Sequence, residues 1–300
     1  MQTTSKVVMV RPANFGYNPE TAANNAFQKR GFEDEAHLKA LNEFDNYVKL
    51  LRENGVFVTV IQDTLEPYTP DSIFPNNWFS THEGGTLVLY PMYAGNRRLE
   101  RKPEVIASIK STFDVKRIVD LTKWEADSLF LEGTGSMVLD RDNDLVYACL
   151  SPRTAKSVLE EFCDELNYDY FLFHAFDLNG QPIYHTNVMM CVGNKFVVAC
   201  LDAIRDIGER EDFIALVEET EKELIEISLG QLNNFAGNML ELKSCKGDQL
   251  LLMSQRAKLS LDEEQIDKLS SYCKILAPDL ATIENNGGGS ARCMIAEIFL

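Results

Sequence analysis

The sequence repeats a strand-turn-strand pattern at a nearly constant interval, and this repetition limits the possible folds more than any other feature. Met137, Val188 and Met239 lie 51 residues apart in turn, and Met294 follows 55 residues later. Self-similarity at roughly 20 to 50 residues is typical of chains whose supersecondary units stack on one another. The segments that open with small or polar residues and run into apolar ones are 76–79, 135–138, 186–189 and 237–240.

Each of these segments is followed by a second apolar run, so every unit contains a predicted hairpin. The turns between the runs, such as Glu83-Gly84-Gly85, carry the residues that hairpin turns favour. Apolar residues at helical spacing lie between the hairpins. Ser151 is the expected N-cap of one helix, and Ser260 with Glu263 forms a capping box for another. The predicted helices are 36–54, 102–113, 152–166, 209–227 and 260–273.

Five such units allow two α/β architectures. One is an ordinary α/β sheet with antiparallel edges. The other is a closed ring, in which each unit packs on the next and the residues that open the strands converge on a common centre. No segment resembles a domain linker, so residues 1–300 are expected to form a single domain.

Composition excludes several classes of protein. The chain has 46 acidic and 29 basic residues, a formal charge of −17, and no basic run, which argues against nucleic-acid and membrane-surface binding. It has no apolar stretch of ~20 residues and no signal-peptide pattern, so we expect a soluble, cytoplasmic protein. Its seven cysteines form no C-x-x-C pair, which argues against a disulfide framework or a zinc site. Most of them are expected to be small buried side chains.

Polar residues at the strand starts include a nucleophile, a base and an acid. Cys293 follows the glycine-rich segment 284–292, which is expected to be a flexible loop, and Arg292 beside it would favour the thiolate. The alternative is a packed strand cysteine. A phosphate-binding loop is disfavoured because its lysine is missing. The strand-start residues are Asn76, Asn77, Glu132, Ser136, His185, Asn187, Asn238 and Cys293.

Of the four histidines, His185 alone opens a repeat. His174 lies in an aromatic run and is expected to be a core residue. Glu132, between an apolar run and two glycines, could orient a histidine ring and stabilise its protonated form. The alternative for Glu132 is a solvated loop carboxylate.

These motifs together resemble the guanidine-modifying, or pentein, superfamily, which includes arginine deiminases, dimethylarginine hydrolases and amidinotransferases. The resemblance covers the whole chain and implies a five-fold pseudosymmetric α/β propeller. It gives Glu132 as the orienting acid, His185 as the acid/base and Cys293 as the nucleophile, in the family's order, with no metal or organic cofactor. Arg97, twenty residues after Asn77, and Arg153, in a Ser-x-Arg-Thr segment, correspond to arginines that bind a substrate carboxylate.

The chain departs from the family at two positions. Asn77 and Asn187 stand where relatives that act on guanidinium groups have aspartates. An unpaired buried cation costs about 3–5 kcal/mol, whereas a neutral ureido group carries no such penalty. Asp71 or Glu284 could instead supply a replacement carboxylate.

We therefore expect a hydrolase that converts citrulline to ornithine, carbon dioxide and ammonia, similar to the citrulline-utilisation branch of the superfamily. Alternatives are an arginine deiminase, a dimethylarginine hydrolase, an amidinotransferase or a non-enzymatic binding propeller. The expected partner is a small amino acid, and a homodimer is possible. The residues expected to bind substrate are Asn76, Asn77, Arg97, Arg153, Asn187 and Asn238.

Overall fold

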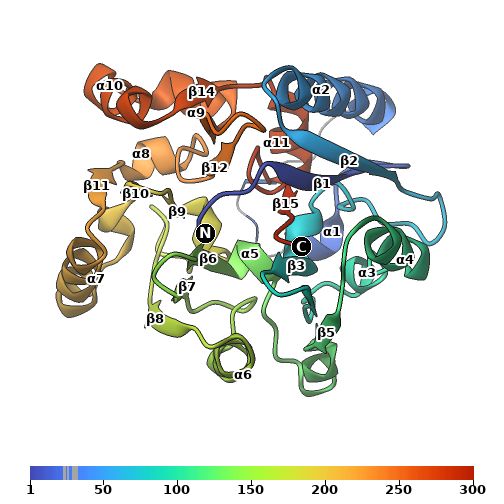
Figure 1. The fold of residues 1–300 in the computed structure, drawn as a ribbon, viewed down its shortest axis with the longest axis horizontal. Coiled ribbons are helices and arrows are strands. Elements are labelled where there is room, and N and C mark those ends of the chain that lie inside the picture. The colour runs from blue at the N-terminus through green and yellow to red at the C-terminus, as the bar shows by residue number, and fades with distance from the viewer. Residues whose placement is uncertain (23–24, 26, 29–32) are drawn as a thin grey trace.

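Five three-stranded sheets stand around a common axis like the blades of a propeller (Figure 1). The computed structural model describes residues 1–22, 25, 27–28 and 33–300. In four blades an antiparallel hairpin forms the inner and middle strands, and the middle strand pairs in parallel with an outer third strand. This arrangement confirms the α/β propeller with five-fold pseudosymmetry and excludes the single open sheet.

Four blades follow one another along the chain. The middle strands β7, β10 and β13 are almost entirely buried, because neighbouring blades pack against both faces. The strands of these blades are β3 (Phe79–His82), β4 (Thr86–Leu89), β5 (Arg117–Asp120); β6 (Met137–Asp140), β7 (Leu145–Cys149), β8 (Asp169–Phe173); β9 (Met190–Val192), β10 (Phe196–Ala199), β11 (Glu223–Glu226); β12 (Leu240–Lys243), β13 (Gln249–Leu252) and β14 (Lys274–Leu276).

The fifth blade is built from both ends of the chain. Its inner strand β15 (Ala296–Glu297) pairs antiparallel with β1 (Lys6–Arg11), which pairs in parallel with β2 (Phe57–Gln62). Figure 1 shows both termini near the centre of the ring. Because the last strand joins the first, the ring closes without leaving the C-terminal unit unpaired.

The longer helices lie at the rim of the propeller (Figure 1). None of the helices in the described part of the chain is long and apolar enough to cross a membrane. The helices are α1 (Pro19–Ala22), α2 (Glu33–Glu53), α3 (Gly95–Arg98), α4 (Pro103–Thr112), α5 (Gly133–Ser136), α6 (Lys156–Leu166), α7 (Ile207–Glu219), α8 (Leu229–Leu232), α9 (Gln255–Ser260), α10 (Glu263–Tyr272) and α11 (Ala281–Gly287).

The outer third strand of each blade corrects the sequence prediction, which contained only hairpins and helices. The helix expected at 209–227 ends at Glu219, and Leu224 lies in β11. Glu221, with a φ of 56°, occupies the left-handed region and separates the two elements. A short strand after a helix carries too few residues for its two-residue period to stand out against the helical one.

Two helix starts also differ from expectation. Helix α6 begins at Lys156 rather than at 152, because the Ser151 hydroxyl bonds to the carbonyl of Tyr184 and the chain turns there. Helix α10 is capped by Asp262, whose side chain accepts from the Gln265 amide, so the expected Ser260 capping box is wrong.

Candidate active site

Three single-turn helices bring the strand-start residues together. They are η1 (Pro75–Asn77), α5 and η3 (Thr186–Val188), and each directly precedes the inner strand of its blade. The Thr134 hydroxyl bonds to the carbonyl of Asn76, and the Thr186 hydroxyl bonds to the carbonyl of Ser136 at 2.6 Å. These bonds fasten α5 to both neighbours, so residues from three blades are held in fixed positions.

Gly135 makes the close approach of these turns possible. A Cβ atom at this position would lie 2.8 Å from Nδ1 of His185 and would overlap the Asn77 amide nitrogen. Real Cβ atoms do not come that close to neighbouring atoms, so only glycine lets the two side chains meet here. Gly135 therefore places Nδ1 of His185 and Nδ2 of Asn77 beside each other.

These residues surround a cavity with about 280 Å³ of atom-free space. It contains the predicted nucleophile, base and both arginines, together with Asp71. Thr21, Asn25 and Tyr184 were not predicted, because they belong to no repeated strand start. The lining residues are Thr21, Asn25, Asp71, Phe74, Asn77, Arg97, Arg153, Tyr184, His185, Gly287, Gly288, Gly289 and Cys293.

Glu132 lies directly behind His185. Its Oε2 atom is 2.7 Å from Nε2 of His185 and 3.3 Å from a terminal nitrogen of Arg153, and its Oε1 accepts from the Tyr93 amide. Burial opposes ionisation of this carboxyl, but Arg153 and then His185 outweigh it and lower its pKa. Glu132 is thus a buried carboxylate, as expected for a residue that orients a histidine.

The contact with Glu132 fixes the tautomer of His185. An ionised carboxylate can only accept, so Nε2 must carry the proton, and in the neutral ring Nδ1 keeps a free lone pair. Burial lowers the pKa of His185 to about 4, although Glu132 acts in the opposite direction. His185 is therefore neutral at pH 7, with Nδ1 available as a base.

The Cys293 thiol contacts two predicted asparagines. Its Sγ lies 3.2 Å from Nδ2 of Asn238 and 3.6 Å from Nδ2 of Asn187. The thiol is buried, with 7% of the residue exposed. Two amide N–H groups are thus positioned as hydrogen-bond donors to the sulfur atom.

The segment before Cys293 differs from the flexible loop that was expected. Helix α11 runs through Gly287, and Gly288, with a φ of 66°, ends it in the left-handed conformation. The Arg292 guanidinium bonds to Glu297 and to the carbonyl of Ile295, so it does not serve the thiol as the sequence suggested.

Glu284 also has a structural role rather than a place in the cavity. Its Oε1 accepts from the Ser290 hydroxyl at 2.7 Å, and its Oε2 lies 3.1 Å from Nε of Arg256. The Ser290 carbonyl in turn accepts from the Cys293 amide. Glu284 therefore stabilises the turn that carries Cys293. Of the two proposed replacement carboxylates, Asp71 and Glu284, only Asp71 lines the cavity.

Arg97 determines which atoms Asn77 presents to the cavity. Its guanidinium donates to Oδ1 of Asn77 at 2.7 Å and is paired with both oxygens of Glu100. Because a guanidinium only donates, the facing atom of the amide must be its oxygen. Nδ2 of Asn77 consequently points away from Arg97 and has no hydrogen-bond partner among the described residues.

The remaining predicted residues lie in other places. Asn76 is buried, donates to Thr134 and is not among the described lining residues of this cavity. Asn187 contacts the thiol but lines a second cavity on the propeller axis. His174, expected in the core, is exposed, lies just beyond the end of β8 and is paired with Glu209.

Within the described part of the chain, no group of three or more His, Cys, Asp and Glu side chains is arranged to hold a metal ion. Of the seven cysteines, six including Cys293 are buried, and Cys245 is exposed. The cavity's polar groups are instead side chains that can bind or react with an organic substrate.

Comparison with solved structures finds the same fold in several proteins of low sequence identity. Several solved structures share its fold: the N-terminal domain of ArgZ covalently bound to a reaction intermediate (16% identity, 97% of each chain, TM-score 0.77), AgrE with L-arginine (17% identity, 97% of this chain and 40% of that one, TM-score 0.77) and a dimethylarginine dimethylaminohydrolase adduct (14% identity, 99% of this chain and 100% of that one, TM-score 0.68). ArgZ is described as an arginine dihydrolase from the ornithine-ammonia cycle in cyanobacteria.

A search among curated proteins gave no match. The family model described as N,N dimethylarginine dimethylhydrolase, eukaryotic, matches residues 11–300. This match covers nearly the whole chain, and it agrees with the propeller and with the resemblance to guanidine-modifying enzymes that the sequence motifs indicated. The chain belongs to the N,N dimethylarginine dimethylhydrolase family.

Proposed function

We propose that this protein is a cysteine-dependent hydrolase that acts on the ureido or guanidino carbon of an arginine-like amino acid. Citrulline is the preferred substrate in this proposal, and ornithine, carbon dioxide and ammonia are its products. Membership of the family supports the class of reaction. The choice of citrulline rests on the cavity of this chain.

The orientation of the Asn77 amide carries the preference for a ureido group. Arg97 holds Oδ1, so the amide presents only N–H groups to the cavity, beside His185. A ureido oxygen can accept a hydrogen bond from these N–H groups. A guanidinium has no acceptor, because each of its nitrogens carries hydrogens, so its N–H groups would face the N–H groups of Asn77. A buried donor left without an acceptor costs about 1–3 kcal/mol, which favours citrulline over arginine by about one to two powers of ten.

Charged groups in the same cavity suit the two ends of an α-amino acid. Asp71 is 2% exposed, and its Oδ1 has no hydrogen-bond partner within the described ranges, so it can accept from a substrate ammonium. Arg97 and Arg153 line the cavity as expected for a carboxylate site. Arg97 is already held by Glu100, which makes its planar fork rigid and leaves fewer N–H groups for substrate.

The chemistry follows from the positions of Cys293 and His185. Nδ1 of His185 takes the thiol proton as Sγ attacks the ureido carbon, and the carbonyl electrons move onto oxygen, near the N–H groups of Asn77. When the tetrahedral adduct collapses, the C–N bond breaks and the amine leaves with the proton from His185. Water then attacks the S-carbamoyl group, the C–S bond breaks, and carbamic acid decomposes to carbon dioxide and ammonia.

Arginine is the second candidate, and a specific observation favours it. AgrE, which shares the fold, has been solved with L-arginine, and ArgZ is described as an arginine dihydrolase. Asp71 supplies a buried carboxylate that could pair with a cation. In this alternative Asp71 would face the guanidinium rather than the substrate ammonium.

Incubation of the pure protein with citrulline, arginine and N,N-dimethylarginine distinguishes these candidate activities. Ornithine from citrulline, with a higher kcat/KM than for arginine, supports the proposal. Citrulline appearing from arginine or dimethylarginine rejects it in favour of a deiminase or dimethylarginine hydrolase. Turnover only in the presence of an acceptor amine identifies an amidinotransferase.

A matched pair of variants tests whether the protein is an enzyme of this class. Cys293→Ala removes the nucleophile and should abolish turnover. Cys245→Ala removes the exposed cysteine and should leave kcat and KM unchanged. Full turnover by Cys293→Ala, or no turnover of any of the three amino acids by the unaltered protein, supports a non-enzymatic binding propeller.

A further inference from the structure

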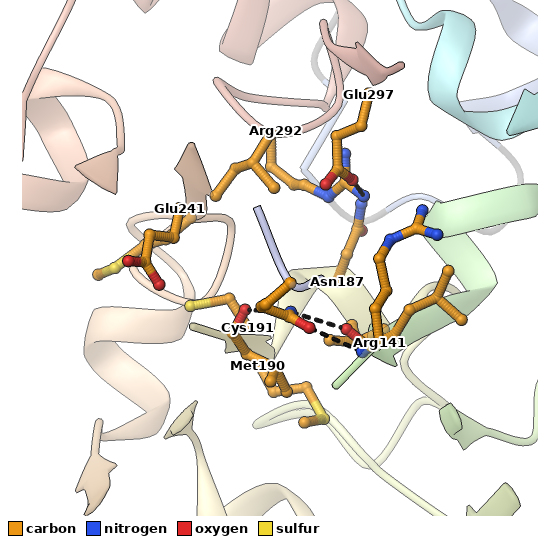
Figure 2. A pocket seen from close by; sticks show the side chains of 13 residues that line it. Arg141, Asn187, Met190, Cys191, Glu241, Arg292 and Glu297 are labelled. Atoms are coloured by element: carbon orange, nitrogen blue, oxygen red, sulfur yellow. Dashed lines mark hydrogen bonds and ion pairs between the residues drawn. The ribbon is translucent and has the colours of Figure 1, made fainter. Parts of the chain in front are cut away.

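A second cavity lies on the propeller axis, and it is lined by Asn187, whose amide contacts the thiol. It contains about 400 Å³ of atom-free space. Figure 2 shows its side chains, which come from the inner strands β6, β9, β12 and β15, from residues next to these strands and from Gln2 near the N-terminus. The residues labelled there are Arg141, Asn187, Met190, Cys191, Glu241, Arg292 and Glu297.

The charged groups of this axial cavity already have partners. Arg292 is paired with Glu297 at 3.0 Å, and both oxygens of Glu241 accept from Asn194. The Arg141 guanidinium lies 3.9 Å from the centre of the Phe299 ring. Because the charges are satisfied, the cavity offers little to an ionic ligand, while its polar wall suits water.

Gln2 crosses the axial cavity near the N-terminus. Its amide nitrogen donates to the carbonyls of Leu139 and Val192, and its oxygen accepts from the Arg141 amide at 2.7 Å. Gln2 thus joins two neighbouring blades and narrows the cavity on that side.

Asn187 connects this cavity to the nucleophile. It is 1% exposed, and its Nδ2 donates to Sγ of Cys293 at 3.6 Å. Its Oδ1 has no hydrogen-bond partner in the part of the chain that the structure describes. An unpartnered buried oxygen on a polar cavity is a place where ordered water binds. Among the described residues, Asn187 lines the axial cavity and not the cavity that holds Asp71 and Asn77.

We propose that the axial cavity supplies the water for the second half of the reaction, and that Asn187 holds this water next to the covalent intermediate. This inference rests on the proposed function. Oδ1 of Asn187 accepts one hydrogen bond from the water. The water oxygen forms a bond to the carbon of S-carbamoyl-Cys293, its other proton passes to Nδ1 of His185, and the C–S bond breaks with its electron pair returning to sulfur. The substrate cavity can stay closed to solvent while the intermediate exists.

Pre-steady-state kinetics with citrulline test the role of Asn187. Asn187→Ala removes the water acceptor and also one N–H donor to Sγ of Cys293, so the first turnover should slow to some extent, while later turnovers should slow by roughly a further tenfold or more. Intact mass spectrometry of the quenched protein should then show a carbamoyl group on Cys293. Asn187→Asp, which keeps an oxygen at this place, should accumulate less of the adduct.

A second pair of variants tests the cavity itself without touching the thiol. Cys191→Met fills the axial cavity and should accumulate the same adduct, whereas Cys200→Met makes the same change at a buried cysteine outside the described lining and should not. If either Met variant fails to fold, Asn187→Ala decides the question alone.

Three results overturn the proposal. A raised KM for citrulline in Asn187→Ala, with the first and the later turnovers slowed by the same factor, would show that Asn187 positions the substrate, as the sequence suggested. A normal first turnover without accumulation of the adduct would exclude a role in the second step, while the proposed function stands. If the unaltered protein turns over none of the three amino acids, both proposals fall.

Discussion

Nε2 of His185 lies 2.7 Å from Oε2 of Glu132, and both residues are almost completely removed from solvent. This pair comes from two blades, and it settles which imidazole nitrogen faces the cavity. Nε2 donates its hydrogen to the carboxylate, so in the proposed mechanism Nδ1 is the atom that exchanges protons with the thiol and the leaving amine.

Glu132→Gln tests this arrangement. The amide keeps the shape but removes the negative charge, so it no longer stabilises the imidazolium or fixes the tautomer, and kcat should fall by about 10²–10⁴-fold. Steady-state kinetics measure the loss. Glu209→Gln is the matched control, because Glu209 forms a similar pair with the exposed His174 and should leave kcat unchanged. A kcat within twofold of the original in Glu132→Gln would exclude the orienting role.

The pH dependence of activity should report the unusual His185. Its pKa is lowered by burial to about 4 from an ordinary value of about 6.5, so the base form persists across the whole range between these values. The acid limb of kcat/KM should therefore have an apparent pKa nearer 4 than 6.5. An apparent pKa near 6.5 for this acid limb would contradict the buried neutral state.

The free energy of unfolding should also depend on pH because of His185. Between about pH 6.5 and 4 the unfolded chain binds a proton at His185 that the folded protein does not, so the free energy of unfolding falls as the pH is lowered through this window. Denaturant unfolding at several pH values measures the slope. In His185→Gln this part of the slope should be missing. An unchanged slope would contradict the lowered pKa of His185 in the folded protein.

Asn77→Asp should reverse the substrate preference. The carboxylate would accept from a guanidinium but repel a ureido oxygen, so kcat/KM for arginine should rise relative to citrulline by about two to four powers of ten. Competition between the two amino acids, followed by product analysis, gives the ratio. Asn234→Asp, at an exposed position, should not change it. If Asn77→Asp leaves the ratio unchanged, the Asn77 amide does not select the substrate.

Gly135→Ala should reduce activity with little effect on the overall fold. The added methyl group would push against His185 and Asn77, and a displacement of about 1 Å at such a site can cost about 10²-fold in rate. Gly230→Ala is the control, since a Cβ there comes no closer than 3.7 Å to the Ser228 hydroxyl. Equal kinetics for the two variants would show that the contact at Gly135 is not tight.

Much of the architecture could be read from the sequence. The 51-residue spacing, the hairpin turns and the apolar runs predict repeated units, and their polar strand starts predict a shared centre that contains Glu132, His185 and Cys293. These features are local in the chain or periodic, so neighbouring residues carry the information. The short third strands, such as β11, were missed because their pairing depends on the previous hairpin.

The function of individual polar side chains was decided only by the tertiary structure. Asn77 and Asn187 each lie in the single-turn helix before an inner strand, yet Arg97 turns the Asn77 amide toward the cavity that contains Cys293, while Asn187 contacts the thiol and lines the axial cavity. Arg292, next to the nucleophile in sequence, pairs instead with Glu297. The sequence determined which groups reach the centre of the ring, because strand periodicity places them there. The structure decided which of them face each other, because hydrogen-bond partners come from other blades, far away along the chain.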